Sequence, residues 1–255
     1  MHWNLHSLPA HKDDLRDLVN LHRPGIVSLN ETYLWEGEEM DLQLWDYNLF
    51  AASLAQIDQG QRRRAGVALL VHSSLPTRPV QDIPGCLLTV EITTPGGPLY
   101  VTSVYLTPAT SPHYDAAQLV ECLTICSLGE EIPHLILGDL NCHLCLDGRE
   151  FERGRAEQVL NWTLDADFTI LQPPQGAFSF TNGRSATLVD YALTSPHPVL
   201  QDASVRFLND LVSDHLAMVV DGLQDFFVVP TTSTSTTSEA LPRIPRHLHL
   251  PSYVC

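Results

Sequence analysis

The sequence predicts an α/β (α+β) fold, a four-layered αββα sandwich of two mixed, mainly antiparallel sheets flanked by helices. Strand, helix and strand patterns follow one another over residues 2–31, which is the start of a layered structure. Strand patterns then succeed one another over residues 46–106 without a helix between them, which favours antiparallel or mixed pairing. A hydrophobic content of 44% in 255 residues is ample for one well-filled core.

Hydrophobic spacing defines the first elements. Residues 2–8 are predicted as a short strand, and the β-branched run GIVSLNE as the next one. Between them, a helix ended by Pro24-Gly25 is predicted from residues at helical spacing: Leu15, Leu18, Val19 and His22. This arrangement predicts a helix that covers one face of the first sheet.

The remaining elements follow in order. Strands are predicted at DYNLFAAS, AGVALLVHSS, CLLTVEITT and PLYVTSVYL, and the turn 95–98 joins the last two. A second helix is predicted at YDAAQLVECLTICSL and a third at about 150–165. Further strands are predicted at DFTILQ, FSFTN, ATLVDYALTS and LAMVVDGL.

The composition changes near the end of the sequence. Residues 1–228 are predicted to form the folded domain. Residues 229–255 include TTSTSTTSE and several prolines without periodicity, which predicts a Ser/Thr/Pro-rich flexible tail or linker.

Charge and cysteine content limit the function classes. The net charge of −16 and the pI near 4.9 oppose nucleic-acid binding, which needs Lys and Arg against phosphates. Six irregularly spaced cysteines predict reduced thiols rather than a disulfide framework. The N-terminus has no secretion signal, and no stretch approaches the ~18 apolar residues of a membrane span. We therefore expect an intracellular protein with no membrane partner.

Polar side chains stand at the ends of several apolar strands. They are Asn4, Glu31, Tyr105, Asp139, Asn141, Asp190, Asp214 and His215. Because catalytic groups are best held where rigid strands end, we expect them to converge on a common rim. Carboxylate and amide oxygens suit Mg²⁺, and an imidazole with carboxylates suits hydrolysis of a phosphate ester.

The ordered motifs WN, NE, VYLTP, GDLN, VDY and SDH resemble the endonuclease/exonuclease/phosphatase superfamily of Mg²⁺-dependent phosphodiesterases. The resemblance spans roughly residues 3–221. Within it, LRDLVNLHRPGIVSLNETYL, GVALLVHSSLP and ILGDLNCHL are most similar to the AP-endonuclease-like endonuclease domain of non-LTR retrotransposons. GDLN or SDH alone would be a weak signal, whereas their ordered combination is specific.

The resemblance implies a metal site and a set of catalytic roles. Glu31 would bind Mg²⁺, with Mn²⁺ as a substitute, and Asn4 and Asp214 would support it. The catalytic residues implied in the same way are Asp139 as general base, Asn141 as the group that orients water or phosphate, His215 as the transition-state contact, Asp190 as its partner and Tyr105 as a phosphate donor.

Several of these residues also have simpler interpretations. Asp139 and Asn141 alone would predict an Asx turn, and Tyr105 alone a strand aromatic. Asp190 lies in an apolar strand, where a buried carboxylate demands a partner, and His215 is the candidate. A serine-hydrolase triad at Ser213 is disfavoured because no G-x-S-x-G motif is present.

Two further clusters were considered as sites. Cys142 and Cys145 have C-x-x-C spacing but no second pair for zinc, and His143 between them is a candidate substrate contact. Arg62, Arg63 and Arg64 form the dense basic cluster of the chain. A solvated loop tip and a phosphate docking site are equally good readings of that triplet.

Three functions are compatible with the sequence. The first is a Mg²⁺-dependent DNA endonuclease of the retrotransposon target-site type, with weak DNA binding in isolation because of the negative charge. A fused or separate reverse transcriptase is its expected partner, and the nucleus its place if it acts on chromosomal DNA. The second is a phosphatase of the same fold acting on a small phosphoester such as an inositol phosphate. The third is an inactive transposon-derived remnant.

Overall fold

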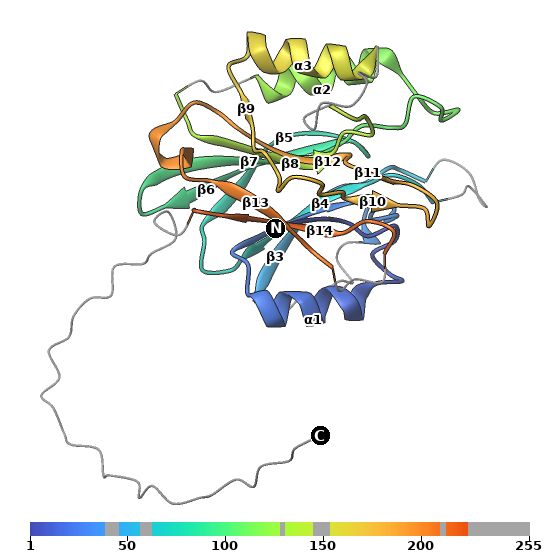
Figure 1. Ribbon diagram of the computed structural model, residues 1–255. Helices are drawn as coiled ribbons and strands as arrows, with labels where there is room; N and C mark the ends of the chain where they lie inside the picture. Colours follow the sequence, from blue (N-terminus) through green and yellow to red (C-terminus); the bar gives the residue numbers. More distant parts are fainter. Residues whose placement is uncertain (39–45, 57–62, 128–130, 145–153, 210–212, 224–255) are drawn as a thin grey trace, which may run out of the picture.

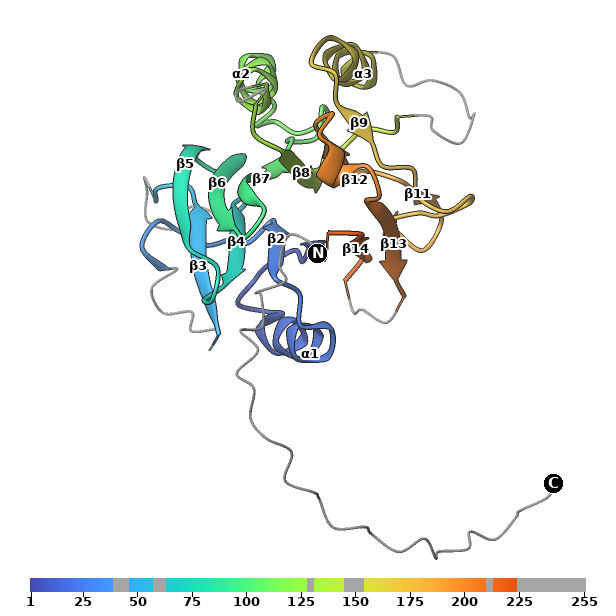
Figure 2. The same cartoon turned by 90° about the vertical axis from the view of Figure 1, so that its left-hand side faces the viewer.

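A computed structural model describes residues 1–38, 46–56, 63–127, 131–144, 154–209 and 213–223. The expected tail at 229–255 and the domain end at 228 lie outside these residues. Two six-stranded sheets face each other, with α1 on the outer side of one sheet and α2 and α3 on the outer side of the other (Figures 1 and 2). The predicted αββα sandwich is confirmed.

The first sheet has the strand order β13-β14-β1-β2-β4-β3. Its strands are β1 (His2–Asn4), β2 (Ile26–Asn30), β3 (Tyr47–Ala52), β4 (Val67–His72), β13 (Ser204–Leu208) and β14 (Ala217–Asp221). β1 and β2 run parallel, and the other neighbours are antiparallel.

The second sheet has the order β5-β6-β7-β8-β12-β9. Its strands are β5 (Thr77–Ile83), β6 (Leu87–Thr94), β7 (Gly97–Tyr105), β8 (His134–Asp139), β9 (Thr169–Ile170) and β12 (Asp190–Thr194). β7 and β8 form its parallel pair. A separate hairpin is made of β10 (Phe180–Thr181) and β11 (Ala186–Thr187).

Alternation along the strands divides the core between the layers. In β4, Val67, Leu69 and Val71 face the second sheet, whereas Ala68 and Leu70 pack toward α1 (Lys12–His22). The outer face of the second sheet is covered by α2 (Ala116–Cys126) and α3 (Arg155–Asp165). Because both faces of the central strands are buried, these strands read as nearly continuous apolar runs.

Two strands were not predicted, and the first strand was predicted too long. The predicted strand ATLVDYALTS is two strands, β11 and β12, and the predicted strand DFTILQ contains the two-residue strand β9. β5 and β13 lie at sheet edges, where side chains are largely exposed and hydrophobic alternation is weak. β5 also contains Pro79, which an edge strand tolerates next to an irregular register. The first strand ends at Asn4 rather than at residue 8, because His6 and Ser7 adopt positive φ angles of 51° and 124°.

The strand register brings polar residues from distant parts of the chain to one edge. In the second sheet, Tyr105 is the partner of Asp139 across β7 and β8, and Asp190 is the partner of Asp139 across β12 and β8. In the facing sheet, Asn4 is the partner of Asn30. The same edge of both sheets therefore carries five polar residues.

Among the helices that the structure describes, none combines the length and the apolar composition needed to cross a membrane.

Candidate active site

A cleft of about 320 Å³ opens at this edge of the sandwich. Its lining consists of His6, Glu31, Asp139, Asn141, Cys142, His143, Phe180, Thr187, Val189, Asp214 and His215. Glu31, Asp139 and His215, which lie far apart in the sequence, thus share one cavity. The convergence expected for the polar strand ends is present.

Asp139 is the centre of the hydrogen-bond network. Its Oδ2 accepts from Asn4 Nδ2 at 3.0 Å and from Asn141 Nδ2 at 3.1 Å, and its Oδ1 accepts from the Asn141 backbone N–H at 2.8 Å. Asn141 has a φ angle of 47°, which turns the chain back over the carboxylate. Asn30 Oδ1 accepts the Asp139 backbone N–H at 2.9 Å and so joins the two sheets.

Glu31 lies beside Asp139 because one amide bridges the two carboxylates. Asn4 Nδ2 donates to Glu31 Oε1 at 3.1 Å as well as to Asp139. Glu31 Oε2 accepts from the Tyr33 hydroxyl at 2.6 Å and lies 3.1 Å from His6 Nδ1. Glu31 and Tyr33 adopt positive φ angles of 51° and 55°, so the chain after β2 is held in an uncommon conformation at the site.

Asp190 and His215 form the pair that burial of Asp190 predicted. His215 Nδ1 lies 2.8 Å from Asp190 Oδ2, and its other nitrogen, Nε2, lies 3.9 Å from Asp139 Oδ2. The second Asp190 oxygen, Oδ1, lies 3.1 Å from His2 Nε2. No role was predicted for His2, because a histidine in a short apolar strand carries no local sign of a partner.

The charges of this cluster shift the pKa values of its members. Burial alone would raise the pKa of Asp190, but the charge of His215 and hydrogen bonds from His2 and His215 hold it below its ordinary value. Burial alone would lower the pKa of His215, but Asp190 and Asp139 raise it. At neutral pH the pair is therefore an aspartate and an imidazolium.

Asp139 and Tyr105 are shifted in the opposite sense to Asp190. Burial, and then the charge of Asp190, raise the pKa of Asp139 above that of an ordinary carboxyl group. Burial and the nearby charges of Glu31 and Asp139 raise the pKa of Tyr105, which also hydrogen-bonds Glu31. Asp139 is thus a stronger base than a free aspartate, and Tyr105 remains a phenol that can donate.

The rim of the cleft is formed by residues near the hairpin and the start of β14. Phe180 lies with its ring centroid 5.0 Å from that of His215, and the Thr181 backbone N–H donates to the Asp214 carbonyl at 2.9 Å. Asp214 and His143 both line the cleft, as expected for residues near metal and substrate. Phe180 was not singled out, because an aromatic residue in an alternating strand pattern predicts packing.

The described arginines of the basic cluster do not line the cleft. Arg62 falls outside the described residues, and neither Arg63 nor Arg64 is part of the lining. The Arg63 guanidinium forms a two-pronged ion pair with Glu38 and donates to the Tyr33 carbonyl at 3.0 Å. Much of its charge is thereby neutralised, although Tyr33 links it to Glu31.

The donor set of the cleft fits a hard divalent cation. Asp139, Asp190 and His215 offer ligand atoms within 4.8 Å of one another. Both Asp190 oxygens already face imidazole nitrogens, so the oxygens that suit a cation in the cleft are those of Glu31 and Asp139. Two carboxylates bridged by one neutral amide concentrate negative charge, which a cation would neutralise.

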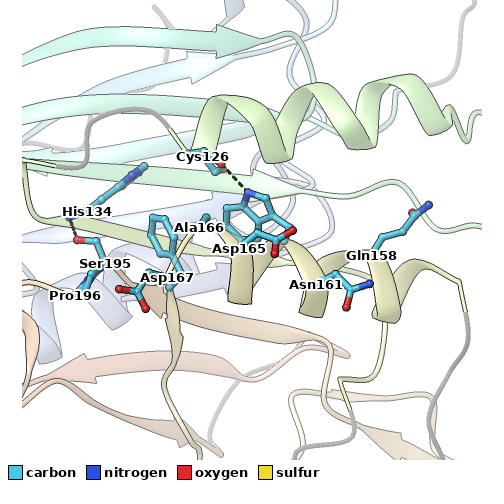
Figure 3. Close-up of a pocket in the computed structure, with 12 residues that line it drawn as sticks. Cys126, His134, Gln158, Asn161, Asp165, Ala166, Asp167, Ser195 and Pro196 are labelled. Carbon is cyan, nitrogen blue, oxygen red and sulfur yellow. Dashed lines mark hydrogen bonds between the residues drawn. The ribbon is translucent and has the colours of Figure 1, made fainter.

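A larger cavity lies elsewhere in the described part of the chain. It measures about 720 Å³ and lies beside α3 and the start of β8, at the end opposite Asp139 (Figure 3). His134, Ser195 and the stacked pair Trp162 and Phe168 belong to its lining, whereas none of the predicted site residues does. We therefore place the chemistry in the smaller cleft.

The fold and the cleft agree with comparisons against known proteins. The sequence profile of the Endonuclease/Exonuclease/phosphatase family matches residues 1–215. The chain belongs to this family. Members of the Endonuclease/Exonuclease/phosphatase family are metal-dependent nucleases or phosphatases, and the oxygen donors of the cleft are consistent with such a metal.

Solved structures share the fold at low sequence identity. The endonuclease domain of TRAS1, a telomere-specific non-LTR retrotransposon, superposes with a TM-score of 0.68 at 18% identity, over 86% of this chain and 94% of that one. An AP endonuclease from Archaeoglobus fulgidus gives 0.66 at 15% identity, over 86% and 97%. The 3′ phosphatase NExo from Neisseria, bound to a product DNA hairpin, gives 0.64 at 18% identity, over 86% and 97%. No curated protein matches the sequence at a comparable level.

Proposed function

We propose that the protein is a Mg²⁺-dependent phosphodiesterase that nicks DNA. One observation carries this proposal. Asn4 holds the carboxylates of Glu31 and Asp139 together, and the imidazole of His215, backed by Asp190, faces the same cleft. A cation site and a positively charged imidazole on one side of a cavity form a receptor for a phosphodiester.

Glu31 would hold the cation, supported by Asn4 and with Asp214 nearby, and Asp139 stands beside it on the other side of the Asn4 amide. When bound, a divalent cation supplies positive charge to the phosphate oxygens, whose negative charge grows in the transition state. Asp139 accepts the proton of the attacking water, for which its raised pKa suits it. The Asn141 amide, which contacts Asp139, orients that water or the phosphate.

His215 and Tyr105 contact the phosphate itself. Asp190 faces His215 Nδ1, so Nε2 points to the cleft, where the imidazolium donates to a non-bridging oxygen. Tyr105 does not line the cleft, but it hydrogen-bonds Glu31 of the lining; it keeps its proton and would donate to the phosphate from beside Glu31. His143, at the rim, contacts the flanking substrate. All of these groups are fixed before substrate arrives, so little reorganisation opposes the reaction.

The acidic surface limits how DNA is bound. A net charge of −16 repels a polyanion at long range, but screening shortens that repulsion to about 8 Å at physiological salt. DNA binding by the isolated chain is therefore weak. Targeting would come from a fused or separate reverse transcriptase, and action on chromosomal DNA would take place in the nucleus. The structural similarity to TRAS1 endonuclease supports DNA as the substrate class.

A second function rests on the same acidic surface. A phosphatase that acts on a small phosphoester, such as an inositol phosphate, would use the same cleft without binding a long polyanion. The net charge favours this alternative, whereas the similarity to an endonuclease domain, an AP endonuclease and a 3′ phosphatase bound to a DNA hairpin favours the first.

Nicking of supercoiled plasmid by the full chain in Mg²⁺ tests the proposal, with Asp139→Ala and His215→Ala as inactive controls. We expect relaxed circles from the wild type, far fewer from either variant, and none with EDTA. Release of phosphate from an inositol phosphate without plasmid nicking would select the phosphatase. Absence of both reactions would identify an inactive remnant.

A further inference from the structure

Two histidines hold Asp190, and they approach different oxygens of its carboxylate. His215 Nδ1 lies 2.8 Å from Oδ2, and His2 Nε2 lies 3.1 Å from Oδ1. The side chains of His2 and Asp190 are completely buried. The contact spans 188 positions of the sequence and joins β1 of the first sheet to β12 of the second.

The far side of His2 is held as firmly. His2 Nδ1 lies 2.9 Å from Ser28 Oγ, which lies 2.8 Å from Ser103 Oγ. Asn30 Nδ2 donates to Ser103 Oγ at 3.3 Å, and Asn30 also accepts the Asp139 backbone N–H. A continuous hydrogen-bond chain thus runs through the buried space between the sheets and reaches both Asp190 and Asp139.

The chemistry of a carboxylate fixes which imidazole nitrogens carry a hydrogen where they face Asp190. An ionised carboxylate can only accept, so the ring nitrogen that faces each oxygen carries a hydrogen. For His215 this places Nε2 on the cleft side, 3.9 Å from Asp139 Oδ2. With one donor the Asp190 carboxylate could rotate about its Cβ–Cγ bond. A second donor on the other oxygen fixes the plane of the carboxylate and with it the tilt of the His215 ring.

We propose that His2 is a positioning residue whose Nε2–H orients the Asp190 carboxylate and, through it, the imidazole of His215. The roles that the resemblance implies for Asp190 and His215 do not include this second histidine. Outer groups that orient a site residue typically influence activity about 10–100-fold. The inference rests on the proposed function for its catalytic consequence, but its structural part stands apart from the reaction.

Replacement of His2 in the full chain tests the inference. Gln places an amide N–H near the position of Nε2 and can still donate to Asp190, whereas Leu fills the space without a donor. We expect His2→Leu to lower kcat for Mg²⁺-dependent nicking about 10–100-fold, with KM changed by less than about threefold. His2→Gln should recover most of this loss.

A matched control separates positioning from stability. Thr102→Val removes the 2.7 Å contact between a buried hydroxyl and the imidazole of His134, at the other end of β8. It should lower the melting temperature to a similar extent as His2→Leu and leave kcat unchanged. If His2→Leu keeps the wild-type kcat, or if His2→Gln loses as much activity as His2→Leu, the positioning role is wrong.

A second measurement does not depend on activity. Nitrogen-15 NMR of the imidazole rings reports the tautomer of His215 and the exchange of its Nδ1–H. We expect a protected Nδ1–H in the wild type and in His2→Gln, and faster exchange in His2→Leu. Identical His215 signals in all three proteins would overturn the inference. If the wild type nicks nothing, but the Nδ1–H of His215 exchanges faster in His2→Leu than in the other two proteins, the proposed function is wrong and the positioning role stands.

Discussion

The two ends of β8 carry buried ionisable residues beside cavities, but only one end has the properties of an active site. At the start of the strand, His134 borders a cavity of about 720 Å³; at its end, Asp139 borders a cleft of about 320 Å³. Both side chains are almost fully buried, at 2% and 1% exposed. Their surroundings differ in charge rather than in depth.

His134 lies among hydroxyl groups and aromatic rings. Its Nε2 lies 2.7 Å from Thr102 Oγ1, and the rings of Tyr100 and Phe168 pack edge-on against it. Its Nδ1 has no partner among the described residues, and burial lowers its pKa to about 4. A neutral imidazole without a carboxylate partner is typical of a core residue.

Asp139 lies among groups that hold or compensate charge. Two amides donate to its carboxylate, Glu31 shares one of those amides, and His215 approaches from the side of Asp190. The comparison shows that convergence of charged groups, rather than cavity volume, distinguishes the reactive end of the strand.

The largest effect is expected for Asp139→Ala. The change removes the proposed base and one of the two carboxylates that face the cation, so kcat for plasmid nicking should fall by about 10³-fold or more. Nicking kinetics in Mg²⁺ give the measurement. Thr102→Val, which removes a contact of His134 at the opposite end of β8, is the control and should nick at the wild-type rate. An equal loss of kcat in both variants would show that the two ends of β8 do not differ in function.

Asp190→Asn should have the next largest effect. The asparagine side chain has an NH₂ group in place of one carboxylate oxygen. That group would face a ring N–H of His2 or His215, and because two donors cannot bond each other, one of the two imidazole contacts is lost. By analogy with an aspartate that orients a catalytic histidine, we expect kcat to fall by about 10²–10⁴-fold. Circular dichroism should show an intact fold. A fully active Asp190→Asn protein would contradict the role of the Asp190–His215 pair.

His134, at the other end of β8, should affect the stability of the protein rather than its activity. Because the folded state lowers the pKa of His134 from 6.5 to about 4, the unfolded chain binds a proton first as the pH falls. The contribution of the neutral His134 imidazole to the free energy of unfolding is complete above pH 6.5 and is lost as the pH falls toward 4. The free energy of unfolding decreases by about 3 kcal/mol over this range.

Urea unfolding between pH 7.5 and pH 4 measures this dependence. His134→Gln cannot take up the proton, so its free energy of unfolding should fall less steeply over that range than that of the wild type. Parallel curves for the two proteins would show that His134 is not the group responsible.

The smallest effect is expected at the edge of the cleft. Arg63 is already paired with Glu38, so replacing Arg63 and Arg64 by Ala should slow plasmid nicking by about threefold to tenfold at low salt. The slope of the logarithm of the nicking rate against the logarithm of the salt concentration should become shallower by about one for each lost phosphate contact. Hydrolysis of a small phosphoester should not change. Unchanged nicking and an unchanged salt slope would exclude phosphate docking by these residues.

Much of the fold and part of the site could be predicted from local patterns. Apolar runs bounded by turns located the central strands, and polar residues at strand ends located Asp139, Asn141 and His215. Burial of Asp190 in an apolar strand required a partner, and His215 is that partner. Edge strands β5 and β13 were missed because a strand with an exposed face and one free edge has no strong hydrophobic pattern.

Local sequence patterns specify which residue types stand where strands end, because hydrophobic runs and turns are local properties of the chain. The tertiary structure alone decided that His2 meets Asp190, that Asn30 holds the Asp139 backbone and that Phe180 packs on His215. These contacts depend on the register of strands and on how two sheets face each other. Both are set by packing across the whole domain, and no short segment encodes them.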